Sequence, residues 1–329
     1  MRARGMKTGL FNASLASSAF IIVAMAGFVP TAQAKTKFVT FTVVDGLPTS
    51  PTSINAKGVV TGSYGFSGTE QGFVRLPDGT IETFQVPGAL HTDPTSINIK
   101  GEVAGRYADS GEPSHGFLRK ADGTLKTFKI PHDNNGDNPV TVNSSGTVFG
   151  YFGRGRTYYG FIRTKNGTVT TVDCGRTFIM AGNDLGASTG NCVSGAFVRD
   201  PDGTFTFFSA GESTNPLNIN NEGMVTGTIE PQEQLEGFLR LADGTVTLFT
   251  VGQSNATTPK SINNDGTITG NFDNGGIVSG FVRTADGTIT TFDPEGSKGT
   301  FPTSINDKGA IAGQYADQNN NGVGFIRTP

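Results

Sequence analysis

The chain has 329 residues and a formal net charge of −3; 35 % of the residues are hydrophobic, 16 % are charged, 47 are glycine and none is tryptophan. This length suffices for two average domains, although a closed all-β fold of this size can be a single domain. The glycine content argues against a helix-rich enzyme core, and the apolar fraction is too high for a disordered chain.

The first 34 residues have the pattern of a secretory signal peptide. Arg2, Arg4 and Lys7 form a basic start, residues 19–29 are apolar, and Ala32-Gln33-Ala34 is a cleavage motif of the A-x-A kind. The apolar run is too short to span a membrane. We therefore expect export to the periplasm or the medium, with no membrane span.

Cleavage before Lys35 would leave 22 basic and 28 acidic residues, a net charge of −6. This mildly acidic chain lacks basic runs, so nucleic acid is not an expected partner.

Residues 35–329 are dominated by a repeat with a period of about 40 residues. The motif Asn-x-x-Gly-x-x-x-Gly occurs seven times, beginning at Asn55, Asn98, Asn143, Asn183, Asn220, Asn263 and Asn306. Each copy is followed by Phe-x-Arg, with the phenylalanines at Phe73, Phe117, Phe161, Phe197, Phe238, Phe281 and Phe325. Six copies continue into Asp/Asn-Gly-Thr and a short aromatic or β-branched stretch.

Each repeat predicts four short strands, which we name a to d in chain order. In the first repeat strand a holds residues 52–54, strand b 59–64, strand c 72–76 and strand d 80–86. Four strands in about 42 residues are typical of a β-propeller blade.

The two ends of the repeat region predict how the ring closes. The last repeat, residues 303–329, stops after strand c, and residues 35–44 begin with an unpaired strand d around Lys37 to Val43. We therefore predict an all-β, single seven-bladed propeller of four-stranded antiparallel blades, in which the N-terminal strand completes the last blade.

The repeat residues also resemble a known family. Thr303-Ser304-Ile305-Asn306, His115-Gly116-Phe117-Leu118-Arg119 and the segment from Asp286 to Phe292 are similar to the extracellular HAF-repeat family of bacteria. The likeness covers nearly all of residues 37–329. It implies β-propeller-type repeats and no defined activity, and the chain departs from the name-giving His-Ala-Phe, since only His115 keeps the histidine and only Ala196 the alanine.

Residues shared by all repeats are expected to build the blades. Asn55-x-x-Gly58 fits a type I turn in which the asparagine bonds its own backbone. The repeated phenylalanines should pack blade against blade, each contributing about 1.5–3 kcal/mol when buried. Each arginine of Phe-x-Arg is expected to pair within its own blade, because six are followed three residues later by Asp or Asn.

Residues that vary between repeats are the candidates for function. In an antiparallel blade the a–b and c–d turns lie at one end, and the b–c and d–a loops at the other. The former are uniform here and the latter vary, so we expect any site on the variable face.

A basic and aromatic b–c loop in the third repeat is the first candidate ligand site. Its residues are Arg154, Arg156, Tyr158 and Tyr159, and His115 and His132 are expected beside it. Arginine forks suit carboxylate or phosphate groups, and tyrosine rings suit sugar faces. The alternative is a solvated loop with packed tyrosines.

Asp317, Asn319 and Asn321 match the start of a calcium loop, with Gly322 at its sixth position. The acid expected at position twelve is missing, so a weak calcium site competes with a simple polar turn. Residues 133–137 imitate the pattern less well, and no other cofactor is expected.

Cys174 and Cys192 are the only cysteines. An exported chain favours a disulfide between them, worth about 3 kcal/mol in the chain-entropy model. A zinc site would need more ligands, and a nucleophilic cysteine would need a nearby histidine.

Catalytic patterns are sparse, because the chain has three histidines and no nucleophile-elbow or metalloprotease motif. We expect a monomeric exported binding or interaction module that recognises an extracellular or cell-surface glycan on its variable face. The alternatives are a polysaccharide lyase or glycosidase and a passive scaffold that contacts a surface protein; the fold alone does not separate them.

Overall fold

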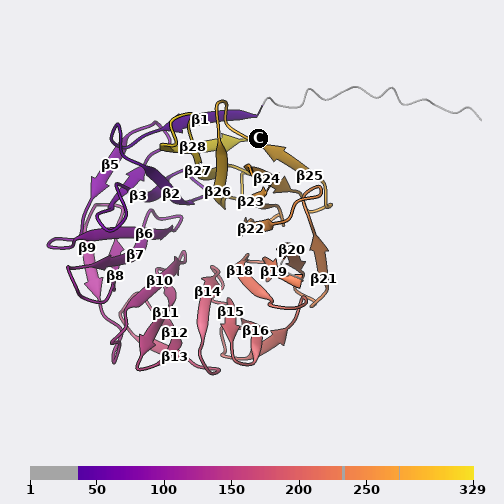
Figure 1. Ribbon diagram of the computed structural model, residues 1–329. Coiled ribbons are helices and arrows are strands. Elements are labelled where there is room, and N and C mark those ends of the chain that lie inside the picture. The colour runs from indigo at the N-terminus through magenta and orange to yellow at the C-terminus, as the bar shows by residue number, and fades with distance from the viewer. Residues whose placement is uncertain (1–35, 232–233, 274) are drawn as a thin grey trace, which may run out of the picture. The chain divides into compact units, whose positions relative to one another are not determined.

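The computed structural model describes residues 36–231, 234–273 and 275–329, and in these residues seven four-stranded antiparallel sheets form a ring (Figure 1). The predicted seven-bladed β-propeller is therefore confirmed. The predicted signal peptide and its cleavage motif lie outside the described residues. Within them, no helix has the length and apolarity that a membrane crossing requires.

Blades 1 to 6 each follow the chain from the inner strand a to the outer strand d. Blades 1 and 2 comprise β2 (Thr49–Ile54), β3 (Val60–Tyr64), β4 (Gln71–Arg75), β5 (Ile81–Phe84), β6 (His91–Ile97), β7 (Val103–Ala108), β8 (His115–Arg119) and β9 (Leu125–Phe128). Blades 3 and 4 comprise β10 (Asp137–Val142), β11 (Val148–Arg154), β12 (Thr157–Arg163), β13 (Val169–Val172), β14 (Phe178–Gly182), β15 (Ser188–Cys192), β16 (Gly195–Arg199) and β17 (Phe205–Phe208). Blades 5 and 6 comprise β18 (Asn215–Ile219), β19 (Val225–Ile229), β20 (Glu236–Arg240), β21 (Val246–Phe249), β22 (Thr257–Ile262), β23 (Ile268–Asp273), β24 (Val278–Arg283) and β25 (Ile289–Phe292).

Blade 7 joins the two ends of the chain. It comprises β26 (Gly299–Ile305), β27 (Ile311–Ala316), β28 (Gly322–Thr328) and, as its outer strand, β1 (Lys37–Phe41). The pairing of β1 with β28 runs from Lys37 opposite Thr328 to Phe41 opposite Gly324. This closure is the predicted one, with strand a of the last blade beginning at Gly299 instead of 303. It protects the outer edge of β28, which would otherwise be open for pairing with another chain.

The second glycine of the repeat motif lies in strand b, where the backbone of strand a comes very close. In blade 1 the register between β2 and β3 shifts between Pro51 and Ser53, which marks a β-bulge. A Cβ on Gly62 would overlap the carbonyl oxygen of Ser50 and lie 2.9 Å from a ring carbon of Phe73. Glycine is therefore required for the bulge and the buried phenylalanine to coexist.

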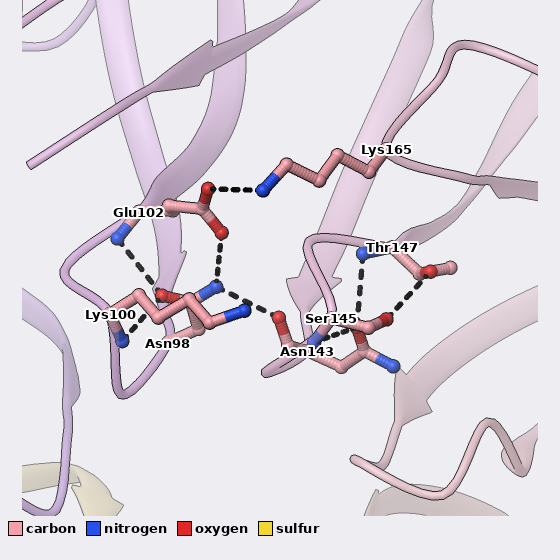
Figure 2. A network of polar contacts seen from close by, with 7 residues as sticks. All are labelled: Asn98, Lys100, Glu102, Asn143, Ser145, Thr147 and Lys165. Atoms are coloured by element: carbon pink, nitrogen blue, oxygen red, sulfur yellow. Dashed lines mark hydrogen bonds and ion pairs between the residues drawn. The ribbon is translucent and has the colours of Figure 1, made fainter.

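The seven motif asparagines confirm the predicted turn and also connect the blades. Asn55 Oδ1 accepts hydrogen bonds from the backbone N–H groups of Lys57 and Val59, each at 3.0 Å. Its amide nitrogen donates to the backbone oxygen of Asn98 in the next blade at 2.9 Å. Figure 2 shows the following link, in which the Asn98 amide donates to the Asn143 oxygen at 2.8 Å.

These links form a closed ring of hydrogen bonds around the axis. The amide of each asparagine donates to the backbone of the next at 2.8–3.2 Å, and Asn306 donates to Asn55. One side chain thus satisfies its own turn and fixes the position of the neighbouring turn, which explains why the residue must be asparagine in every blade.

The phenylalanines of strand c are fully buried, as expected. Five arginines of Phe-x-Arg pair within their own blade, as predicted, but through the backbone oxygen of the following residue at 3.0–3.4 Å rather than through the Asp or Asn three residues later. Six guanidinium groups lie 4.5–5.0 Å from the ring centroid of a phenylalanine in the outer strand of the preceding blade. Arg119 also forms an ion pair of 2.8 Å with Glu82 of the preceding blade. The arginines therefore connect blades, because burial of the guanidinium favours an aromatic face over an exposed turn carboxylate.

Candidate functional site

The two ends of the ring differ in what they offer a ligand. An axial cavity of about 320 Å³ opens among the a–b turns and is lined by the asparagine ring and by side chains such as Ile54, Ile97 and Ile219. The amide nitrogens of that ring are already engaged in hydrogen bonds between blades. The seven motif amides are therefore not free to bind a ligand, although Asp184, Asn221, Asn264 and Asp307 also line the cavity. The b–c and d–a loops vary more from blade to blade than these turns do.

The hairpin between β11 and β12 presents two exposed cationic side chains on the variable face. Arg154 pairs with Thr157, so residues 155 and 156 form a two-residue turn, with Gly155 at a φ of 64°. Arg154 and Arg156 are both exposed. The tip is held by the neighbouring d–a loop, because Gly155 N donates to Asn134 Oδ1 at 2.8 Å and Asn135 Nδ2 donates to Gly155 O at 2.6 Å.

The two tyrosines of this hairpin lie on opposite sides of blade 3. The Tyr158 ring lies 4.9 Å from that of Phe178 in blade 4. The Tyr159 ring stacks on Phe152 at 5.6 Å and packs against a cluster that includes Ala104 of blade 2. Successive side chains of a strand point to opposite faces, so the structure does not bring the two rings together as one sugar-binding surface. Of the two tyrosines, Tyr158 is the one whose ring faces blade 4.

The two histidines predicted near the hairpin have different environments. His132 is exposed and has a positive φ of 67°. His115, at the start of β8, is buried, and its ring lies 5.9 Å from that of Tyr107. The structure therefore places His115 in the interior, beneath the variable loops, and His132 on the surface.

His115 meets two carboxylates that the sequence did not single out as its partners. Its Nδ1 lies 4.0 Å from Asp133 Oδ2 and 3.8 Å from Asp137 Oδ2. Burial raises the pKa of Asp137 to about 7, and desolvation lowers the pKa of His115. The low-dielectric surroundings thus disfavour the charged form of both groups.

The predicted calcium loop is a turn whose carboxylate bonds its own backbone. Asp317 Oδ1 accepts hydrogen bonds from the N–H groups of Asn319 and Asn321, each at 2.8 Å. Asp317 Oδ2 accepts one from Asn321 Nδ2 at 3.0 Å. Calcium binding by Asp317, Asn319 and Asn321 stays a prediction, and it would require some of these hydrogen bonds to be exchanged for metal bonds.

The predicted disulfide between Cys174 and Cys192 is confirmed, with a Cα–Cα distance of 5.8 Å. Cys174 follows the outer strand of blade 3, and Cys192 ends β15 in blade 4. The bond therefore joins two neighbouring blades next to the hairpin that carries Arg154 and Arg156.

Comparisons with known proteins support the fold. The catalytically inactive virginiamycin B lyase of Staphylococcus aureus with quinupristin is similar at a TM-score of 0.63 and 16 % identity, over 90 % of this chain and 100 % of that one. A streptogramin B lyase gives 0.62 and 16 % identity over 89 % and 98 % of the two chains. The β-propeller domain of the trilobed protease from Pyrococcus furiosus, which has an open velcro topology, gives 0.57 and 11 % identity over 85 % and 92 %.

No family model and no curated protein matches the chain. At these identities the structural likeness shows a propeller, a fold that carries many unrelated activities.

Proposed function

We propose that this protein is an exported binding module that recognises an extracellular or cell-surface glycan through the variable face of the propeller. The observation that carries the proposal is the β11–β12 hairpin, where Arg154 and Arg156 are exposed on a tip that Asn134 and Asn135 hold in place. Two guanidinium groups on a backbone turn that is held in place suit the carboxylate or phosphate groups of an acidic polysaccharide.

Exposed apolar side chains on the same face also favour binding to a macromolecule. Val44, Phe66, Leu90, Val193 and Ile277 are 42–78 % exposed. All five lie in b–c or d–a loops, which occupy the variable end of the blades. Five more large apolar side chains are exposed elsewhere on the ring: Ile99, Leu185, Phe207, Leu248 and Phe301. The five on the variable face come from several blades and would supply separate apolar contacts to a large ligand.

The ring explains how such a surface can be both rigid and variable. The asparagine links and the strand pairing of each blade lie outside the b–c and d–a loops, so these loops can change without loss of the ring. Specificity carried by loops on a fixed scaffold is the common arrangement in binding proteins.

Binding to an array of bacterial and plant polysaccharides would test the proposal. We expect saturable binding to an acidic polysaccharide, at least tenfold weaker in the Arg154→Ala/Arg156→Ala double variant because both guanidinium groups are removed. Lys57→Ala is the matched control, since Lys57 is exposed on an a–b turn at the opposite end of the blades. Equal losses in both variants, or no saturable binding, would contradict the proposed site.

The same experiment separates a binding module from the polysaccharide lyase or glycosidase alternative. A binding module leaves the polysaccharide unchanged, whereas a glycosidase produces new reducing ends and a lyase produces unsaturated sugars. Products that disappear in the double variant at an unchanged melting temperature would replace the binding proposal by an enzymatic one. Retention of a surface protein, without any glycan, would instead support the scaffold alternative.

A further inference from the structure

We propose that His115, Asp133 and Asp137 bind one divalent transition-metal ion, of the zinc or manganese class, at the base of the variable loops between blades 2 and 3. Each of the three residues offers one ligand atom, and these atoms all lie within 4.8 Å of one another. The site is distinct from the Asp317 loop and is independent of the glycan proposal.

The burial of the cluster is the first argument for an ion. The side chains of Asp133 and Asp137 are 3 % and 0 % exposed, and that of His115 is 11 % exposed. Among the described residues, His115 Nδ1 and Asp137 Oδ1 are buried without a hydrogen-bond partner. Buried polar atoms normally have a partner, and leaving one unpaired is destabilising. A cation between the three side chains would satisfy the imidazole nitrogen and offset both carboxylate charges.

The distances within the cluster suit a shared ion better than direct hydrogen bonds. His115 Nδ1 lies 3.8 Å from Asp137 Oδ2 and 4.0 Å from Asp133 Oδ2, which is too far for a hydrogen bond. Two atoms that each lie about 2.0–2.2 Å from one metal ion are separated by roughly 3–4 Å. The observed spacing therefore needs only a small contraction when an ion binds.

Backbone hydrogen bonds hold both carboxylates in fixed orientations. Asp133 Oδ1 accepts from the N–H groups of Asn135 at 2.9 Å and Gly136 at 2.7 Å, which leaves Oδ2 facing His115. Asp137 Oδ2 accepts from Ile130 N at 3.0 Å. Outer contacts of this kind orient the ligands of metal sites and raise their affinity.

The donor set selects the class of ion. An imidazole nitrogen with two carboxylates suits zinc or manganese, whereas calcium prefers six to eight oxygen ligands. The same short loop also holds the arginine hairpin, because Asn134 and Asn135 contact Gly155. An ion at Asp133 would therefore stiffen the tip that carries Arg154 and Arg156.

Calorimetric titration of chelator-treated protein with zinc, manganese and calcium chlorides would test this site. We expect one equivalent of zinc or manganese to bind, with calcium at least tenfold weaker. His115→Gln and Asp137→Asn should each weaken binding at least tenfold, since each removes one ligand. A thermal melt of each variant establishes that it is folded, and His115→Gln carries the test if the fully buried Asp137 does not tolerate replacement.

Two matched controls make the outcome specific. His132→Gln removes an exposed histidine of the same loop region, and Asp317→Asn removes the acid of the other candidate metal loop; neither should change zinc or manganese affinity. The proposal is overturned if neither ion binds saturably, if His115→Gln binds as tightly as wild type, or if Asp317→Asn abolishes the binding.

Discussion

The junction between blades 3 and 4 differs from the other six junctions in the residues that hold the blades together. At each of the six, a phenylalanine of one outer strand meets the buried strand-c phenylalanine of the next blade, with ring centroids 5.9–6.5 Å apart. At the seventh, Val172 stands in place of the outer phenylalanine. Phe197 of blade 4 instead packs against Phe205 of its own blade at 5.2 Å.

A second substitution at this junction fills the space that the missing ring would occupy. At the regular junction between blades 5 and 6, Phe249 and Pro259 cover Gly237, and a Cβ there would lie 2.7–2.9 Å from both. At the exceptional junction, Ile179 replaces the proline, and Ile179 and Val172 cover Gly160 at 2.9 and 3.1 Å from its hypothetical Cβ. The large phenylalanine ring and the small proline ring of the regular junction are thus replaced by two β-branched side chains of intermediate size, Val172 and Ile179.

The exceptional junction is also the one with the disulfide, since Cys174 and Cys192 join the blades on either side of it. The comparison teaches that the scaffold tolerates a weaker aromatic contact where a covalent bond and a matched aliphatic pair replace it. The asparagine ring continues unchanged across this junction, with Asn143 donating to Asn183 at 3.2 Å.

Removal of β1 should destabilise the fold more than any other change considered below, because β1 supplies the blade 7 side of the junction between blades 7 and 1. Deleting residues 36–44 removes Phe41, the partner of Phe73 and Arg75, and exposes the edge of β28. We expect aggregation or loss of the cooperative melt, measured by gel filtration and calorimetry. A monomer with an unchanged melting temperature would refute the role of the closure.

The repeat, the blade and the closure were predictable because each depends on local patterns. Strand alternation and the Asn-x-x-Gly turn are visible within a few residues, and the two incomplete ends of the array complete each other. The partner of each asparagine's amide nitrogen was not predictable, because the accepting backbone oxygen lies in the next blade. Except at the closure from Asn306 to Asn55, that acceptor is 37–45 residues away in the sequence. The local turn accounts for the hydrogen bonds that the side-chain oxygen accepts, whereas the hydrogen bond that the side-chain nitrogen donates is visible only in the folded ring.

The candidate site was predicted in part for the same reason. Sequence reasoning identified the Arg154–Arg156 hairpin and the Asp133–Asp137 loop, and it expected His115 nearby. Whether His115 would face the carboxylates depended on how blades 2 and 3 pack, which no local pattern records. The separation of Tyr158 from Tyr159, in contrast, follows from the period of two in a strand and could have been predicted.

Loss of the disulfide should have the second-largest effect and should act at the exceptional junction. Cys174→Ser/Cys192→Ser is expected to lower the free energy of unfolding by about 3 kcal/mol, because the 18-residue loop is no longer closed in the unfolded chain. Denaturant unfolding measures the loss. Reductant should destabilise wild type and leave the variant unaffected; an equal response of both proteins would contradict a stabilising bond.

Restoring the regular aromatic at the exceptional junction should be destabilising by itself. Val172→Phe adds a ring where Ile179 already covers Gly160, and overpacking of this kind costs about 1–3 kcal/mol. Ile179→Pro in the same protein should recover most of that loss, because it recreates the pair formed by Phe249 and Pro259. A double-mutant cycle of unfolding free energies measures the coupling. Additive effects of the two changes would show that the residues do not compensate each other.

The smallest expected difference concerns the arginines that follow the buried phenylalanines. Arg240 lies 5.0 Å from the ring of Phe208, whereas the blade before Arg199 carries Val172 at the position of that ring. Arg240→Ala should therefore cost about 1 kcal/mol more in unfolding free energy than Arg199→Ala. Both arginines also donate to the backbone oxygen of the following residue, at 3.0 and 3.2 Å, so each variant loses the same type of hydrogen bond. Equal losses would show that the aromatic face adds nothing to the regular junctions beyond its packing.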